Sequence, residues 1–221
     1  MDLNELRNFG DKLLDLLTGP YAGINLTRIL DPDEFFNKQI LDSVKPLVES
    51  ELFQNVLRGT NTVVDVGFGG GFPLLPLAYL YPEVNFIGFE ARNKKVKTVS
   101  QIAGELGLKN VFLHHQRLEE VKFDMPAIVT LKAVGKVGDF LPKISTTKDL
   151  TVFFFKGPNF LEQEKEGLSI IESKWKLIEE SCVDIPGTEK RLLLAFKPKN
   201  VPCGTFGKNL KKLSQFVPRR T

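Results

Sequence analysis

Five short apolar segments in the middle of the chain restrict most strongly the fold that it can adopt. Their hydrophobic residues are continuous rather than alternating, which is typical of strands buried on both faces of a parallel sheet. Helix-like stretches separate them, most clearly at residues 93–108. The segments are 62–66, 84–90, 110–114, 126–131 and 151–156.

Two further apolar runs, 176–185 and 191–197, flank the turn-like sequence PGTEK and predict a closing antiparallel pair. Seven strands with helices between them indicate a Rossmann-like, doubly wound α/β sheet. Residues 1–58 read differently, as a helical cap. Leu6, Phe9 and Leu13 recur at helical spacing within 3–17, and Asp31-Pro32 is typical of a second helix start, with Asp31 as the cap.

Composition and charge are those of a single globular protein with a basic end. With 221 residues, 42% hydrophobic and 26% charged, the chain suits one α/β domain with attached segments. We therefore divide it into a cap (1–58), a main domain (59–200) and a tail (201–221). The net charge is only +3, but the last 23 residues contain no acid. Their cations are Lys199, Lys208, Lys211, Lys212, Arg219 and Arg220.

The same sequence features predict a cytoplasmic protein without a membrane segment. The acids that begin at Asp2 are unlike a signal peptide. No apolar run approaches the roughly 20 residues that span a bilayer. Cys182 and Cys203 are too few for a disulfide framework, and with His114 and His115 they are too scattered for a zinc site. We expect no metal.

A glycine-rich loop follows the first strand, in the sequence VVDVGFGGGFPLLPLA at 63–78. Gly67, Gly69 and Gly71 alternate, whereas the dinucleotide fingerprint needs its third glycine at position 72, which is Phe72. A Walker loop is excluded because no Gly-Lys-Ser/Thr follows. Pro73 suits the first position of a helix. The loop therefore predicts a nucleotide-like ligand at the carboxyl edge of the sheet.

Acidic residues lie at the end of the second strand and shortly after the third. Glu90 ends the second strand, where a carboxylate can accept hydrogen bonds from both ribose hydroxyls of NAD or S-adenosylmethionine. RLEE, at 117–120, follows the third strand and offers an acceptor for an adenine amino group. Three elements on successive strand ends are suited to holding a nucleoside along its length.

Several motifs together resemble the ribosomal RNA small subunit methyltransferase G family, also called glucose-inhibited division protein B. The family methylates N7 of one guanine in 16S rRNA with S-adenosylmethionine. The resemblance covers about residues 20–200, and ILDS with VGxGxGFPLLPLA is its most specific part. The motifs are NLT (25–27), LDS (41–43), VDVGFGGGFPLLPLA (64–78), KK (94–95), GELGLKNV (104–111), RLEE (117–120) and FFKGPN (154–159).

The resemblance implies a seven-stranded S-adenosylmethionine-dependent methyltransferase sheet and a set of site residues. Methylation of N7 needs no general base, because this nitrogen carries a lone pair and no proton. Lys132 is the expected source of electrostatic help, and cations at 38, 92, 94 and 95 and in the tail are expected at a phosphate-contacting rim. We expect a monomer that acts on 16S rRNA or the small subunit. The expected cofactor residues are Asp65, Gly67, Gly69, Gly71, Phe72, Glu90, Leu118, Glu119 and Lys132.

Three departures from the family pattern keep alternatives open. Lys38-Gln39 stands where Arg-His is usual, Lys132 replaces an arginine, and Lys190-Arg191 replaces a second Arg-His. A lysine lacks the planar fork that holds a carboxylate or phosphate through two hydrogen bonds. The alternatives are a methyltransferase for another substrate, and a weakly active or non-catalytic descendant that binds RNA or the cofactor. A nicotinamide-dependent oxidoreductase is disfavoured by Phe72.

Overall fold

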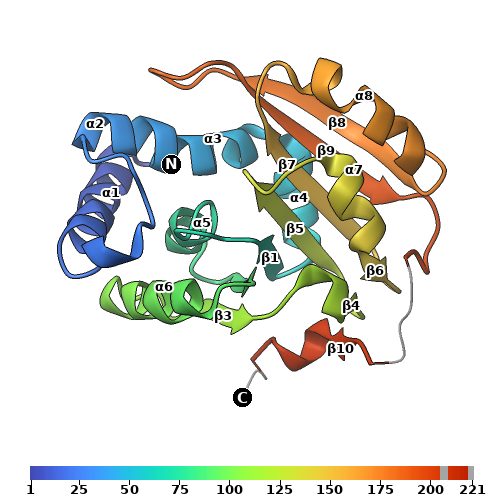
Figure 1. Cartoon of the computed structure of the whole chain (residues 1–221), viewed down its shortest axis with the longest axis horizontal. Coiled ribbons are helices and arrows are strands. Elements are labelled where there is room, and N and C mark those ends of the chain that lie inside the picture. The colour runs from blue at the N-terminus through green and yellow to red at the C-terminus, as the bar shows by residue number, and fades with distance from the viewer. Residues whose placement is uncertain (205–208, 219–221) are drawn as a thin grey trace.

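A seven-stranded sheet organises the chain in the computed structural model, which describes residues 1–204 and 209–218. Five strands are parallel, and β9 is antiparallel to both of its neighbours, as Figure 1 shows. This confirms the predicted strands, including the closing antiparallel pair. In spatial order they are β3 (Val111–His115), β2 (Asn85–Glu90), β1 (Thr62–Val66), β5 (Ala127–Lys132), β7 (Leu150–Lys156), β9 (Arg191–Pro198) and β8 (Trp175–Val183).

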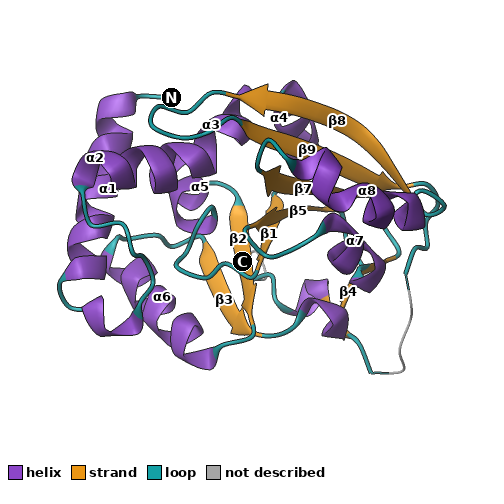
Figure 2. Cartoon of the chain, turned by 45° about the horizontal axis from the view of Figure 1, so that its top comes forward, coloured by secondary structure: helices purple, strands orange, loops and turns teal. Residues whose placement is uncertain are grey.

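Both faces of the central strands β2, β1, β5 and β7 are buried, as the continuous apolar segments predict, whereas the edge strands β3 and β8 are partly exposed. Within β1, Val63 packs into one hydrophobic core and Val64 into the other. The first core includes side chains of α5 (Leu74–Leu80) and α6 (Asn93–Glu105), and the second those of α7 (Val137–Phe140) and α8 (Phe160–Ile171). Figures 1 and 2 show these two helical layers on either side of the strands.

The N-terminal helices pack on the first of these cores. The Asp31 side chain caps α2 by accepting a hydrogen bond from the Glu34 amide at 2.8 Å, as predicted. Phe53, fully buried, meets Phe153 of β7 edge to face with 5.7 Å between ring centroids. The cap and the sheet therefore share one core. The elements are α1 (Leu3–Thr18), η1 (Ala22–Ile24), α2 (Pro32–Phe35), η2 (Phe36–Leu41), α3 (Asp42–Glu49) and α4 (Glu51–Gly59).

The described part of the C-terminal tail packs against the main sheet. Leu213 is fully buried, and Phe216 meets Phe89 of β2 edge to face at 5.1 Å. The tail strand β10 (Lys211–Lys212) pairs in parallel with β4 (Val121–Phe123), which also pairs with β6 (Ser145–Thr146). The short helices η3 (Leu118–Glu120), η4 (Leu141–Lys143) and η5 (Leu213–Gln215) complete the order. Lys208, Arg219 and Arg220 lie outside the described residues, and the three-part domain division stays a prediction.

The described helices include none with both the length and the apolar character that a membrane crossing requires.

Candidate active site

A cavity of about 560 Å³ opens at the carboxyl ends of β1, β2 and β5. The chain order reverses between β1 and β5, and ligands of open α/β sheets bind at such a reversal. The volume lies in the usual range for ligand sites. The cavity is lined by Leu26, Gln39, Val66, Gly67, Phe68, Gly69, Gly70, Phe72, Phe89, Glu90, Ala91, Arg92, Lys95, Gln116, Arg117, Leu118, Glu119, Lys132, Ala133, Val134, Phe140 and Lys143.

The glycine loop forms one wall of this cavity. Gly67 has φ +72°, and a Cβ atom there would lie only 2.7 Å from Cγ1 of Val134. Gly69, at φ +56°, also lines the wall, but a Cβ atom there would have no contact closer than 3.7 Å. Gly71 lies outside the cavity, packed against Leu75. The loop thus brings bare backbone to the cavity surface at Gly67 and Gly69.

The segment after the loop differs in one detail from the prediction. α5 begins at Leu74, so Pro73 is its N-cap and not its first residue. Phe72, just before it, is buried and lines the cavity. Its ring meets Phe35 of the N-terminal cap edge to face, with 5.8 Å between centroids. The aromatic residue that replaces the third dinucleotide glycine therefore joins the loop to the cap.

The carboxylate of Glu90 supports the glycine loop from the end of β2. Its Oε2 accepts a hydrogen bond from the Gly69 amide at 3.2 Å, and its Oε1 accepts one from the Arg92 amide at 2.9 Å. The side chain is buried but remains part of the cavity wall. Glu90 thus presents a carboxyl group at the cavity wall that two backbone amides hold in place beside the loop.

The third predicted element, after β3, also reaches the cavity. Leu118 is buried and Glu119 is exposed, and both line the wall. Their neighbour Gln116 donates a hydrogen bond to Glu120 and accepts one from Nζ of Lys211 at 2.7 Å. This wall is therefore held in part by the C-terminal tail.

Asp65 lies beneath the loop, outside the cavity wall, and is almost completely buried. Its Oδ1 accepts a hydrogen bond from Oγ1 of Thr130 at 3.0 Å. Burial raises the pKa of Asp65 to about 7, against the lowering effects of Thr130 and Lys132. The amide of Leu74 also lowers the pKa, although Oδ2 makes no hydrogen bond of regular geometry with the described residues. Asp65 therefore lies beneath the loop and does not line the cavity.

Lys132 lines the cavity at the end of β5, but its charge is already paired. Its Nζ lies 2.9 Å from Oδ2 of Asp42, and Oδ1 of Asp42 accepts a hydrogen bond from Nε of Arg191 at 2.8 Å. The side chains of Lys132, Asp42 and Arg191 are only 11%, 7% and 30% exposed. This triad joins α3 to β5 and β9, and it carries a net charge of +1.

Asp42, the anion of the triad, directly follows an irregular turn of the N-terminal helices. Residues Phe36–Leu41 form a π-helix, and the amide of Asp42 accordingly bonds to the carbonyl of Asn37. Such turns are frequent at functional sites. Gln39 within it lines the cavity. Two residues from the three departures, Gln39 and Lys132, therefore line the cavity. Lys132 and a third such residue, Arg191, both pair with Asp42.

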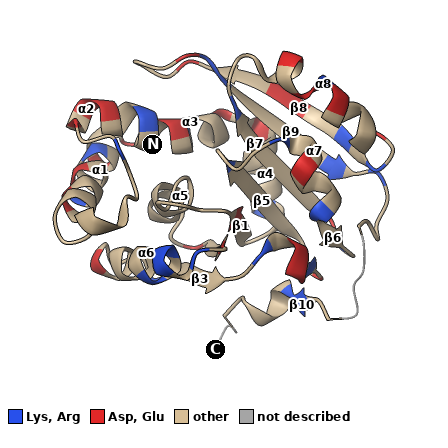
Figure 3. Ribbon diagram, viewed as in Figure 1, with Lys and Arg blue, Asp and Glu red and all other residues tan. Residues whose placement is uncertain are grey.

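The predicted basic rim is only partly assembled. Arg92 and Lys95 line the cavity, and Figure 3 shows basic residues along α6. Lys38 instead pairs with Glu34 at 2.5 Å. Lys156, at the end of β7, lies outside the cavity wall and pairs with the buried Glu164 at 2.6 Å. The cations of the cavity wall therefore come from the start of α6, with Arg92 and Lys95, and from Arg117, Lys132 and Lys143.

The two histidines have structural surroundings. His114 packs against Phe216, with 4.8 Å between ring centroids, and burial lowers its pKa. Nε2 of His115 lies 2.9 Å from the carbonyl oxygen of Ala91. Neither histidine lines the cavity.

Sequence reasoning missed several parts of the wall. Leu26 had a signal in the sequence, because it belongs to the NLT motif, and in the structure its carbonyl oxygen would lie 2.5 Å from a Cβ atom at Gly70. Val134, Phe140 and Lys143 follow β5 and carried none. Their part in the wall depends on how the loop after β5 folds back over the sheet edge.

Comparisons with known proteins agree on one family. A family model described as rRNA small subunit methyltransferase G matches residues 8–187. The ribosomal RNA small subunit methyltransferase G of Lactobacillus helveticus (strain DPC 4571) is 34% identical, covering 80% of this chain and 76% of the relative. That of Solibacter usitatus (strain Ellin6076) is 36% identical over 66% of this chain and 68% of its own length.

A solved structure supports the fold independently. A SAM-dependent O-methyltransferase from Thermotoga maritima superposes with a TM-score of 0.50. It is 15% identical in sequence, and the match covers 88% of this chain and 73% of that one. This confirms the predicted methyltransferase fold.

The first prediction concerns the Asp42 triad. Asp42→Asn removes the only anion between two partly buried cations, so we expect the free energy of unfolding to fall by about 3 kcal/mol. Asp33→Asn is the control, because Asp33 pairs with Arg7 at 2.6 Å but is 82% exposed. It should cost less than about 1 kcal/mol. Urea denaturation measures both, and equal losses would contradict the role given to Asp42.

The second prediction concerns the pH dependence that Asp65 produces. In the unfolded chain the carboxyl group ionises near its ordinary pKa of 3.8, whereas in the folded chain it keeps its proton until about pH 7. Unfolding therefore becomes easier as the pH rises between these values. An Asp65→Asn variant should gain stability relative to the parent across this range. Asp184 is exposed, so the Asp184→Asn variant should show the same change of unfolding free energy with pH as the parent. If the unfolding free energies of Asp65→Asn and the parent differ by the same amount at every pH, the raised pKa of Asp65 is refuted.

Proposed function

Because the chain belongs to the rRNA small subunit methyltransferase G family, we propose that it transfers the methyl group of S-adenosylmethionine to N7 of a guanine in 16S ribosomal RNA. The observation that carries this proposal is the meeting of three strand ends at one cavity. They contribute Gly67 and Gly69 after β1, Glu90 at the end of β2, and Leu118 with Glu119 after β3. The same proposal describes a cytoplasmic monomer.

The residues present fit an adenosyl ligand. At Gly67 a Cβ atom has no space, and at Gly69 the bare backbone faces the cavity. The buried carboxylate of Glu90 is held by two amides, so it is oriented before a ribose arrives. Leu118 supplies an apolar surface for a base, and Glu119 supplies an acceptor for its amino group.

The protein's contribution to the reaction is positioning. S-adenosylmethionine, when bound, supplies an electrophilic methyl group on a sulfonium sulfur. Guanine N7 would be the nucleophile toward this methyl group, and because N7 carries a lone pair and no proton, the residues of the cavity wall would have to align the two reactants and would have no proton to remove. Rate enhancement then comes from holding the reactants at near-attack distance. Among the described residues of the cavity wall, the groups that could act as a general base are the carboxylates Glu90 and Glu119, and this proposal assigns both to binding of the adenosyl group.

The Asp42 triad supplies the electrostatic part of this proposal. Asp42 compensates one of its two cations and leaves a net charge of +1 at the cavity margin. Lys132 is the member that lines the cavity. We assign to it the attraction of the carboxylate of the methyl donor or of a substrate phosphate, with Asp42 and Arg191 as positioning residues.

A methyl-transfer assay tests the function directly. Small subunits that lack the modification are incubated with S-adenosylmethionine labelled in its methyl group, and the methylated base is mapped by cleavage specific for N7-methylguanine. We expect label at one guanine of 16S rRNA. Absence of label in 16S rRNA, whether assembled or free, rules the proposal out. Label at another base or in a protein assigns the chain to a different substrate.

A third prediction separates cofactor binding from turnover. Gly67→Asp introduces a Cβ atom 2.7 Å from Val134 and a charge at the loop, at a φ that disfavours side chains. Because the displaced loop and the added carboxylate stand in the cavity wall, we expect binding to weaken by about 3 kcal/mol, which corresponds to a loss of affinity of more than about 100-fold. Calorimetric titration with S-adenosylmethionine measures it. Gly59→Asp, at an open position at the end of α4, should bind like the parent. Unchanged affinity in Gly67→Asp would show that the loop is not the ligand site.

A further inference from the structure

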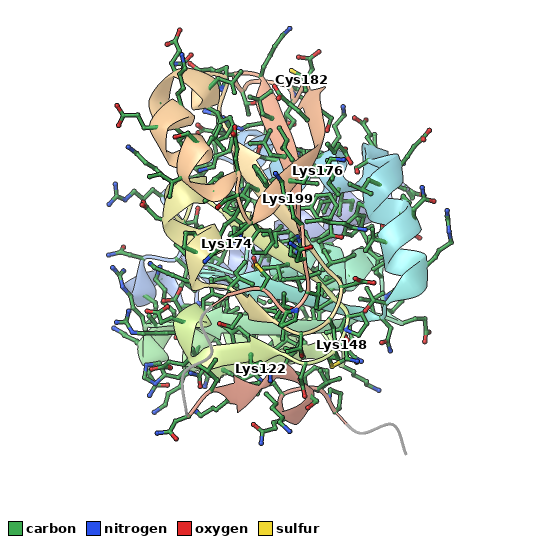
Figure 4. The ribbon with its side chains drawn as sticks, turned by 90° about the vertical axis from the view of Figure 1, so that its right-hand side faces the viewer. Lys122, Lys148, Lys174, Lys176, Cys182 and Lys199 are labelled. Atoms are coloured by element: carbon green, nitrogen blue, oxygen red, sulfur yellow. The ribbon has the colours of Figure 1, made fainter. Side chains whose placement is uncertain are left out.

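Four lysines form two directly opposed pairs at the far end of the antiparallel strands. Lys176 of β8 lies opposite Lys197 of β9 in the strand register. The next pair continues this register, because the Lys199 amide donates a hydrogen bond to the Lys174 carbonyl at 2.8 Å. We call Lys174, Lys176, Lys197 and Lys199 the lysine surface. Figure 4 shows Lys174, Lys176 and Lys199 close together on this side of the molecule.

The four side chains are directed to one face of the strand pair and are exposed. Trp175 and Phe196, which alternate with them, are buried in the second core. Because successive strand residues point to opposite faces, the lysines share the other face. Among the described residues, no carboxylate forms an ion pair with any of the four. Asp149 lines the same surface hollow as Lys197 without pairing with it.

This arrangement is unfavourable for the isolated protein. Like charges directly opposite on paired strands destabilise a sheet. Lysines on an exposed edge strand protect against edge-to-edge association, and this explains Lys174 and Lys176, since β8 is the edge of the sheet. It does not account for Lys197 and Lys199, because β9 lies between β7 and β8 in the sheet and is not its edge, although its pairing with β7 ends at Phe196. The presence of Lys197 and Lys199 beside the edge lysines therefore points to a ligand.

The spacing and composition of the lysine surface suit a phosphate backbone. The opposed lysines are about 5 Å apart across the strands and about 7 Å apart along each strand, so several anions of one chain meet several ammonium groups. Lysine binds phosphate as a point charge. Interfaces with proteins are instead enriched in aromatic residues and arginine, which the lysine surface lacks. The chemistry thus favours nucleic acid over an acidic protein.

We propose that the lysine surface is a second RNA-binding site, separate from the cavity. The lysine surface lies at the end of the sheet where the parallel strands begin, because Trp175 and Pro198 are level with the beginning of β7. Lys132 and the cavity lie at the other end, where the parallel strands finish. The length of β5 separates the two ends by roughly 17 Å. A large folded RNA spans this distance, so one contact holds the RNA while the cavity receives a base. The inference takes RNA as the partner from the proposed function but uses none of the cavity residues.

The test removes charge from one pair and compares it with a matched control. Lys176→Gln/Lys197→Gln is compared with Lys109→Gln/Lys165→Gln, whose lysines are exposed and lie outside the lysine surface. Binding of protein-free 16S rRNA is measured over a range of salt concentrations. Loss of two phosphate contacts should make the plot of log K against log salt shallower by roughly 1.5 and weaken binding about tenfold at physiological salt. The control should keep the parent's slope.

Two further measurements separate this inference from its alternatives. The Lys176→Gln/Lys197→Gln variant should have at least the parent's stability to urea and should bind S-adenosylmethionine equally well, so lost RNA affinity does not reflect misfolding. A slope equal to that of the control overturns the proposal. So does weaker binding to intact small subunits without weaker binding to free 16S rRNA, since that result indicates a protein partner.

The outcome is independent of the methyl-transfer assay. If the parent binds RNA through the lysine surface but methylates nothing, the proposed reaction fails and the second site stands. If it methylates 16S rRNA while both variants bind RNA with the same salt slope, the reaction stands and the second site fails.

Discussion

Burial of both faces of the parallel strands is the constraint on which the rest of this structure depends. A strand such as β1, with Val63 in one core and Val64 in the other, has no face left for a ligand. Along such strands, functional groups can gather only at the strand ends, where the chain turns and backbone groups are free, and the cavity occupies the carboxyl ends. The lysine surface lies instead on an exposed face of β8 and β9, at the opposite end of the sheet, where the strands are not buried on both faces.

The carboxylate of Asp42 links the cap to this framework. One buried anion holds Lys132 on β5 and Arg191 on β9, so the N-terminal helices are tied to the edge of the sheet where the cavity opens. Against the family pattern, Lys132 replaces an arginine and Arg191 replaces a histidine. Both changes meet at the same carboxylate. In this chain the ammonium group at the carboxylate therefore comes from β5, through Lys132, and the guanidinium group from β9, through Arg191.

Contacts between distant segments also complete the cavity wall. Gln116 is held by Lys211 of the tail, and Phe89 of β2 packs against Phe216. Phe72 of the glycine loop packs against Phe35 of the cap. The cavity wall is therefore built on the central sheet and held in place by both terminal segments. The shape of the cavity therefore depends on segments that lie far from the glycine loop in the sequence.

The sequence by itself determined the strands, the capped helix at Asp31, the glycine loop and the placement of Glu90 at a strand end. These features depend on local patterns: continuous apolar runs, cap residues, and a motif that directly follows a strand. Only the tertiary structure decided that Lys132 pairs with Asp42 and Arg191, that Lys156 turns away to Glu164, and that four lysines face one another. Those outcomes depend on strand register and on contacts such as Asp42 with Arg191, 149 residues apart. A local pattern carries no information about which distant charge will lie beside it, because that proximity arises only when the elements pack.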